Sequence, residues 1–263
     1  MNIHLIITSI VEGITEFIPV SSTAHIIIVS KLMSVDLTTD YIKFFLLFIQ
    51  FGALFAGIFL FAKKLLTNKQ MFINVCISFV PTAIVGFILY KLFKHLLEGN
   101  MPLIGFTLLV GGVIFIYLEK VFMKKRGGES DLANFGKTEI SYTDAFVIGL
   151  AQATAIIPGV SRSGATIVGG ILRGIKKAII IEYTFILALP TIAAATLYDM
   201  YKSRAIFSAI HSYAELATGF IVSFVVAGVT LYLLKKYLPR ISLTAFGWYR
   251  IALAALIFIV ITI

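Results

Sequence analysis

Residues 12–25 have the sequence EGITEFIPVSSTAH and residues 158–166 the sequence PGVSRSGAT, and both are short polar interruptions in otherwise apolar sequence. Each contains a proline, which removes a backbone donor and restricts the residue before it, so each stretch is expected to break a helix. The serine and threonine residues that follow are suited to begin a new helix. The two stretches therefore predict two helical hairpins, with turns at Pro19 and Pro158.

The sequence around these interruptions has the composition of a polytopic membrane protein. Hydrophobic residues make up 59% of the chain and charged residues 13%, and the mean hydropathy is +1.00, values that a soluble protein with a polar surface could not accommodate. A helix needs roughly 20 apolar residues to cross a bilayer, where lipid offers its backbone groups no other partner. Six stretches come near or above this length and predict an all-α fold with six transmembrane helices: 44–62, 71–90, 102–117, 179–198, 214–234 and 243–263.

The remaining composition excludes several classes of protein. The net charge of +9 comes mainly from basic residues in short loops between apolar stretches, so it indicates membrane topology and no nucleic-acid partner. Cys76 is the only cysteine, so neither an internal disulfide nor a cysteine-rich metal site can form. The N-terminus lacks a basic region, and its apolar run is interrupted by Glu12 and Glu16, so we expect no cleaved leader.

Short sequence matches at a nearly constant spacing indicate an internal repeat. They pair 20–22 with 160–162, 78–80 with 223–225, and 105–106 with 247–248, at offsets of 140, 145 and 142. We expect a single membrane domain over residues 1–263, in which two halves of related fold, 1–123 and 142–263, are joined by a polar linker, 124–141.

The basic residues indicate whether the segments 2–31 and 142–173 cross the membrane or turn back within it. If both cross, ten lysines and arginines fall on each side, whereas if both are re-entrant, 14 fall on one side and six on the other. Because cytoplasmic loops carry an excess of basic residues, we expect two re-entrant helical hairpins and both termini on the non-cytoplasmic side. Three crossings per half then make the two halves an inverted repeat.

Two helix N-termini that meet near the membrane midplane predict an anion site. Their free N–H groups and helix dipoles favour negative charge, and the planar guanidinium of Arg162 suits a phosphate. An intramembrane ion pair with Glu12 or Glu16 is the structural alternative for Arg162. The other expected ligand-binding residues lie in the same stretches, where the glycines let the backbone approach closely: Ser21, Thr23, Ser161, Ser163, Gly159, Gly164 and Thr166.

Glu12 and Glu16 are candidate metal ligands. They lie four residues apart on one face of a helix, where two carboxylates repel unless a cation or a shared proton intervenes. We favour a divalent metal, and a protonated, structurally hydrogen-bonded glutamate is the alternative. His25 follows Ser22 by three residues, close enough to exchange a proton with it or with a bound phosphate.

Both stretches closely resemble the two signatures of the undecaprenyl-diphosphate phosphatase family, the integral-membrane bacitracin-resistance proteins. The resemblance extends over the whole chain in length, motif order and duplicated layout, and it departs at Ala24, where many members have glycine. It implies hydrolysis of undecaprenyl diphosphate to the monophosphate and inorganic phosphate, which recycles the lipid carrier for peptidoglycan and other wall polymers. It also implies dependence on Mg²⁺ or Ca²⁺ and a site reached from the outer face of the cell membrane.

With this substrate, the diphosphate would lie between the two turns, with the metal on Glu12 and Glu16 and with Arg162 on the transferring phosphoryl group. Phosphoryl transfer needs mainly positioning and charge stabilisation. Ser22 would attack the terminal phosphorus while His25 or Glu16 takes its proton. A phosphohistidine at His25 and direct attack by water are the open alternatives.

Two other functions share some of these features. Inverted repeats with broken helices also build secondary transporters, so a polyprenyl-phosphate flippase or an anion transporter is the main alternative. The type 2 phosphatidic-acid phosphatases also act on membrane lipid phosphates, but they need a histidine soon after their Ser-Arg motif, and here the first histidine after Arg162 is His211. The isoprenoid length, the identity of the metal and the formation of a homodimer are not specified by the sequence.

Overall fold

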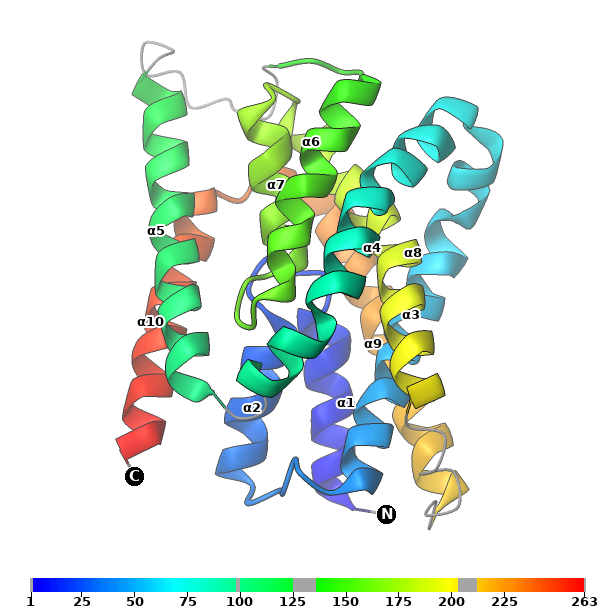
Figure 1. Cartoon of the computed structure of the whole chain (residues 1–263), viewed down its shortest axis with the longest axis vertical. Coiled ribbons are helices and arrows are strands. Elements are labelled where there is room, and N and C mark those ends of the chain that lie inside the picture. Colours follow the sequence, from blue (N-terminus) through cyan, green and yellow to red (C-terminus); the bar gives the residue numbers. More distant parts are fainter. Residues whose placement is uncertain (1, 98–99, 125–135, 203–211, 263) are drawn as a thin grey trace.

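The computed structural model describes residues 2–97, 100–124, 136–202 and 212–262, and in this part of the chain every regular element is a helix. The described residues form ten α-helices and two short 3₁₀ helices (Figure 1). Their bounds are α1 Ile3–Thr15, α2 Ser22–Leu32, α3 Asp40–Thr67, α4 Lys69–Leu97, α5 Met101–Lys124, α6 Tyr142–Ala153, η1 Thr154–Ile156, α7 Arg162–Leu172, α8 Lys177–Lys202, α9 Tyr213–Tyr237, η3 Leu238–Arg240 and α10 Leu243–Thr262.

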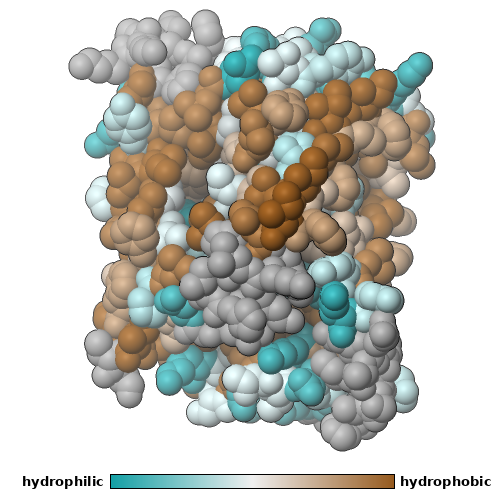
Figure 2. All heavy atoms as spheres, viewed as in Figure 1, coloured by the Kyte–Doolittle hydropathy of each residue, from teal (hydrophilic) through white to brown (hydrophobic). Residues whose placement is uncertain are grey.

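Six of these helices are long and apolar enough to cross a membrane, which confirms the expected number of spans. They are α3, α4, α5, α8, α9 and α10, and each overlaps one of the apolar stretches predicted from the sequence. Many of their large apolar side chains are exposed, among them Phe59, Phe87 and Trp248. Figure 2 shows large brown patches on the visible face, with teal patches near its upper and lower ends, as expected of a surface in contact with lipid.

The long helices pack in pairs around the shorter ones. Helix α5 packs along α10, α3 packs along both α8 and α9, α1 lies against α9, and α6 lies against α4. The main hydrophobic core gathers buried aromatic and aliphatic side chains of several of these helices, including Phe17, Phe61, Tyr183 and Phe185. Helix α2 packs mainly on α1, and α7 packs on both α6 and α8, so the short helices are held by each other as well as by the long ones.

The short helices form two hairpins that enter the molecule from opposite ends (Figure 1). Helices α1 and α2 rise from the end at which both termini lie, and α6 and α7 descend from the other end. The turn 16–21 of the first hairpin and the turn 154–161 of the second lie together in the middle, where the Ser163 hydroxyl donates to the Ile18 carbonyl at 3.1 Å.

The open end of the α6–α7 hairpin is held by charged and polar groups. Asp144 is buried and accepts from Arg173 Nε at 2.7 Å and from Lys137 Nζ at 3.3 Å. Burial alone would raise the pKa of Asp144, but hydrogen bonds from Ser141, Arg173 and Lys137 outweigh it and lower the pKa to about 2. Asp144 also completes a capping box with Ser141 at the start of α6.

The polar linker expected at 124–141 is described only at its ends, since residues 125–135 lie outside the described part of the chain. Its last residues are structured. Lys137 donates its backbone N–H to the Gly174 carbonyl at 2.8 Å and accepts from the Lys176 N–H at 3.0 Å, and Ile140 is buried. This end of the linker is therefore joined to the connection between α7 and α8.

Candidate functional site

The two glutamates lie at the end of α1, where the chain enters the first turn. Glu12 and Glu16 are 2% and 9% exposed, although both carry carboxyl groups. Glu16 follows the last residue of α1 and still donates its backbone N–H to the Glu12 carbonyl at 3.0 Å, so the helical spacing is kept. The Glu12 carboxyl lies within hydrogen-bonding reach of the Glu16 carboxyl. The expected pairing of the two side chains on one face is confirmed.

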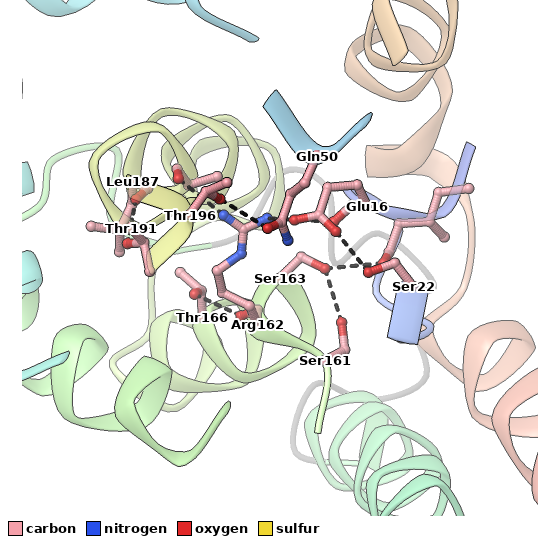
Figure 3. Close-up of polar contacts among 12 residues, drawn as sticks. Glu16, Ser22, Gln50, Ser161, Arg162, Ser163, Thr166, Leu187, Thr191 and Thr196 are labelled. Atoms are coloured by element: carbon pink, nitrogen blue, oxygen red, sulfur yellow. Dashed lines mark hydrogen bonds and ion pairs between the residues drawn. The ribbon is translucent and has the colours of Figure 1, made fainter. Parts of the chain in front are cut away.

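Ser22 is the first residue of α2, and its hydroxyl points back across the turn to Glu16. Ser22 Oγ donates to Glu16 Oε2 at 2.6 Å, as Figure 3 shows. The residue before it, Ser21, has φ 74° and ψ 98°, a left-handed conformation that is uncommon for any residue other than glycine. The side chain of Ser21 makes no capping hydrogen bond, so the first N–H groups of α2 have no side-chain cap.

Arg162 is the first residue of α7 and connects the second hairpin to the first. Its Nη2 donates to Glu16 Oε1 at 3.0 Å and lies 3.4 Å from the Glu16 carbonyl, while Nη1 donates to the Ala188 carbonyl of α8 at 3.0 Å. The ion pair is largely buried, with side-chain exposures of 15% for Arg162 and 6% for Glu16. The ion pair with a glutamate that was the structural alternative for Arg162 is thus present. Because Glu16 also accepts from Ser22, this ion pair brings the guanidinium close to Ser22 (Figure 3).

The other polar residues of the second stretch support this arrangement. Ser161 caps α7 by accepting from the Gly164 N–H at 3.2 Å, and its hydroxyl lies 3.0 Å from that of Ser163. Thr166 is buried one turn further along α7 and donates to the Arg162 carbonyl at 2.9 Å. Thr23, in the first hairpin, is exposed. Ser161 and Ser163 lie at the contact between the two turns, whereas Thr166 lies within the packing of α7.

His25 is directed away from Ser22. Its Nδ1 lies 2.7 Å from the Ser21 carbonyl, one turn back along α2, and its Nε2 lies 2.7 Å from the Tyr249 hydroxyl. A carbonyl cannot donate, so Nδ1 carries the proton and Nε2 of the neutral ring accepts from Tyr249. Of the two bases considered for Ser22, the structure therefore places Glu16, and not His25, in hydrogen-bonding contact with it.

The two glycines expected to approach a ligand instead approach α5. Gly159 has φ 81°, and a Cβ there would lie 2.1 Å from Thr107 Oγ1. A Cβ on Gly164 would lie 3.1 Å from Phe115. Glycine is needed at both positions because α5 occupies the space that a side chain would fill. The sequence alone could not indicate this packing.

Sequence reasoning did not identify Arg250, which contacts both turns. It lies in α10, is 2% exposed, and donates to the Pro19 carbonyl at 3.3 Å and to the Gly159 carbonyl at 3.1 Å. The sequence could have indicated Arg250, because it is a charged residue inside the apolar stretch 243–263. Charged residues within membrane spans are functional candidates by default.

Two further residues lie near the site, and nothing in the sequence indicated that they would. Gln50 of α3 accepts from Thr196 of α8 at 2.9 Å, and Figure 3 places its side chain beside Glu16 and Arg162. Tyr249 stacks on the His25 ring with centroids 5.7 Å apart. Gln50 and Tyr249 belong to helices far from both motifs in the sequence, so their proximity depends on the tertiary fold.

The donor set at the first turn suits a hard divalent cation. Glu12 and Glu16 present adjacent carboxyl groups, and oxygen ligands are those preferred by Mg²⁺ and Ca²⁺. Among the residues that the structure describes, no cluster of three or more His, Cys, Asp or Glu side chains could hold a metal. Two carboxylates are a partial shell of the kind that Mg²⁺ completes with water and substrate phosphate oxygens.

These features define a class of protein: a helical, multi-pass membrane protein whose two central turns bring a serine, a carboxylate pair and an arginine together in its interior. The chain belongs to the family described as bacitracin resistance protein BacA, whose model matches residues 5–256.

Curated relatives match the chain over almost its whole length. It is 41% identical to the undecaprenyl-diphosphatase of Campylobacter hominis, over 96% of both chains. It is 42% identical to the undecaprenyl-diphosphatase of Persephonella marina, over 95% of both chains. It is also 39% identical to that of Aquifex aeolicus, over 94% of this chain and 93% of the relative. The family resemblance stated from the two motifs is confirmed.

Proposed function

We propose that this protein hydrolyses undecaprenyl diphosphate to undecaprenyl phosphate and inorganic phosphate in the cell membrane, and so recycles the lipid carrier for wall-polymer synthesis. Family membership and the names of its relatives support the reaction. The single structural observation that supports it best is the continuous contact from the Ser22 hydroxyl through the Glu16 carboxylate to the Arg162 guanidinium. These groups are a nucleophile, a base and a phosphate-binding cation.

In the reaction, the terminal phosphoryl group of the substrate lies between the two turns. Ser22 Oγ attacks the terminal phosphorus and passes its proton to Glu16, which already accepts a hydrogen bond from it at 2.6 Å. The new bond is Oγ–P, and the bond that breaks joins the phosphorus to the bridging oxygen, which leaves with its electron pair on undecaprenyl phosphate. Water then attacks the phosphoserine, releases inorganic phosphate and restores the Ser22 hydroxyl.

Arg162 and the start of α2 stabilise the charge of the transferring group. The guanidinium offers fork-like donors to phosphoryl oxygens and lies 3.0 Å from Glu16. The first N–H groups of α2, which have no side-chain cap, favour an anion in the same place. Charge developing on the equatorial oxygens would thus meet donors from both hairpins.

Glu12 and Glu16 would hold a divalent cation, Mg²⁺ or Ca²⁺, whose contribution when bound is to neutralise diphosphate charge. The two carboxyl groups are buried and adjacent, and a cation would relieve their mutual repulsion. His25, which is joined to Tyr249, would orient α2 and Ser21 and would not act as the base.

We infer that the two hairpins are re-entrant and that the halves form an inverted repeat. The six long helices account for the membrane crossings, which leaves α1–α2 and α6–α7 as hairpins from opposite ends. The packing of α1 on α9 has a counterpart in that of α6 on α4, as expected if the halves are equivalent. By the count of basic residues, the end that carries both termini faces away from the cytoplasm.

Phosphate release by the purified protein in detergent tests the proposal. Polyprenyl diphosphates of several chain lengths are compared, with and without EDTA, for the wild type and for Glu16→Gln. We expect release by the wild type, loss with EDTA, recovery with Mg²⁺ or Ca²⁺, and a loss of about 10²-fold or more in Glu16→Gln. Absence of release by the wild type, despite binding of the lipid, would favour a flippase or transporter, because detergent leaves no second compartment.

A further inference from the structure

Arg250 is the one residue outside the two motifs whose side chain contacts both turns among the hydrogen bonds of the described residues. Its guanidinium donates to the carbonyls of Pro19 in the first turn, Gly159 in the second turn and Thr107 in α5, at 3.3, 3.1 and 3.4 Å. The guanidinium carbon also lies 5.7 Å from the centre of the Phe115 ring. The Arg250 side chain therefore bonds to three segments that are distant in sequence: the two turns and α5.

The surroundings of Arg250 are shaped to hold this group. A Cβ on Gly111 of α5 would lie 2.4 Å from Arg250 Nη2, so a larger residue there would displace the guanidinium. Among the described residues no carboxylate forms an ion pair with Arg250, and its Nε has no partner. A buried cation without a carboxylate is costly, and here its compensation comes from the carbonyls of the turns.

The other contacts between the turns lie in the two motifs themselves. Arg162 bonds to Glu16, and Ser163 bonds to the Ile18 carbonyl. Both of these side chains are proposed to meet the substrate, so their bonds to the first turn would change during turnover. Arg250 bonds to backbone carbonyls alone, and those bonds can persist throughout the reaction.

We propose that Arg250 is a positioning residue that fastens the two turns to each other and to α5, and so sets the distance between Ser22 and Arg162. This inference rests on the proposed phosphatase function. A fork of donors is required because three carbonyls point at the group from different segments, and a lysine ammonium would hold them in a different geometry. A displacement of about 1 Å between reacting groups can cost about 10²-fold in rate.

The test compares Arg250→Lys, Arg250→Met and Gly111→Ala with two matched controls. Arg240→Lys repeats the first change at an exposed arginine, and Gly86→Ala adds a methyl group where nothing lies within 4 Å. Three quantities are measured on the folded fraction: kcat, KM for the polyprenyl diphosphate, and backbone hydrogen exchange of residues 16–21 and 154–161.

We expect Arg250→Lys and Gly111→Ala to lower kcat about tenfold to 10²-fold with KM within about threefold. Exchange should increase in both turns and not in the remainder of the protein, and the controls should match the wild type. If Arg250→Met does not fold, the other two variants decide, since each retains a cation at residue 250.

Three results would overturn the inference. The first is unchanged kcat and exchange in Arg250→Lys and Gly111→Ala. The second is a rise in KM with kcat retained, which would assign Arg250 to substrate binding. The third is a lower unfolding temperature with normal kcat per folded molecule, which would make the role merely structural. Lack of phosphate release by the wild type would instead refute the proposed function, and the exchange comparison would still test the fastening of the turns.

Discussion

The two hairpins enter the molecule from opposite ends, and their turns are built differently. In the first turn, Ser21 has a left-handed backbone conformation and makes no side-chain cap, and among the described residues the Ser22 hydroxyl bonds to Glu16. In the second turn, Ser161 caps α7 and Gly159 packs on Thr107. The first turn thus carries the proposed nucleophile and base, and the second packs against α5 and carries Arg162.

If the halves form the proposed inverted repeat, this contrast means that they have different tasks in the reaction. The two breaks bring two helix N-termini together, but the proposed reaction needs a nucleophile and its base only once. The half that lacks them can use its serines for capping and its hairpin base for anchoring through Asp144. Equivalent substitutions in the two hairpins should therefore have unequal effects.

The largest expected difference is between Ser22→Ala and Ser161→Ala. Loss of the nucleophile should reduce kcat about 10³-fold or more. Loss of the α7 cap should cost about 1 kcal/mol of stability and less than about tenfold in kcat. Steady-state phosphate release and thermal unfolding measure the two effects. Equal losses of activity would contradict the division between a reactive and a supporting turn, and so would phosphoenzyme trapped on a residue other than Ser22.

The next largest difference in kcat is expected between arginine-to-lysine changes at the two ends of α7. Arg162→Lys keeps the charge but loses the fork, and we expect kcat to fall about 10²-fold. Arg173→Lys, at the open end of the hairpin, keeps a cation beside Asp144 and should remain within about threefold of the wild type. The same phosphate assay measures both. Wild-type kinetics in Arg162→Lys would show that fork geometry has no role.

Asp144→Asn should make the stability of the protein less dependent on pH, because the ionised Asp144 holds the open end of the second hairpin. The folded-state pKa of about 2 lies below the ordinary value of roughly 4, so the ionised group contributes stability above about pH 4. That contribution is lost as pH falls through the folded-state pKa, toward about pH 2. Unfolding in detergent between pH 6 and pH 2 should show a loss of stability in the wild type that exceeds the loss in Asp144→Asn. Parallel profiles would mean that the anchor does not depend on the charge.

The smallest expected changes in kcat concern the two left-handed residues of the turns. Ser21→Gly should relieve about 1 kcal/mol of backbone strain and leave kcat within about threefold, because no capping bond is lost. Gly159→Ala should destabilise by more than about 1 kcal/mol, since φ is 81° and the new Cβ would lie 2.1 Å from Thr107. Unfolding temperatures measure both. A large kcat loss in Ser21→Gly would mean that its side chain takes part in the reaction.

Much of this arrangement could be predicted from local sequence. The six spans followed from the lengths of apolar stretches, and the breaks followed from Pro19 and Pro158, because both effects act within a few residues. The pairing of Glu12 with Glu16 followed from helical spacing. His25 was harder to place, since its spacing from Ser22 did not show that both ring nitrogens would be occupied by Ser21 and Tyr249.

The sequence by itself determined the class of protein, the two broken hairpins and the kinds of groups in the site, because hydropathy, proline geometry and charge are properties of neighbouring residues. Only the tertiary structure decided which groups meet: Glu16 with Ser22 and Arg162, and Arg250 with both turns. These contacts join residues up to 231 positions apart, and they depend on how the helices pack, which no local pattern encodes.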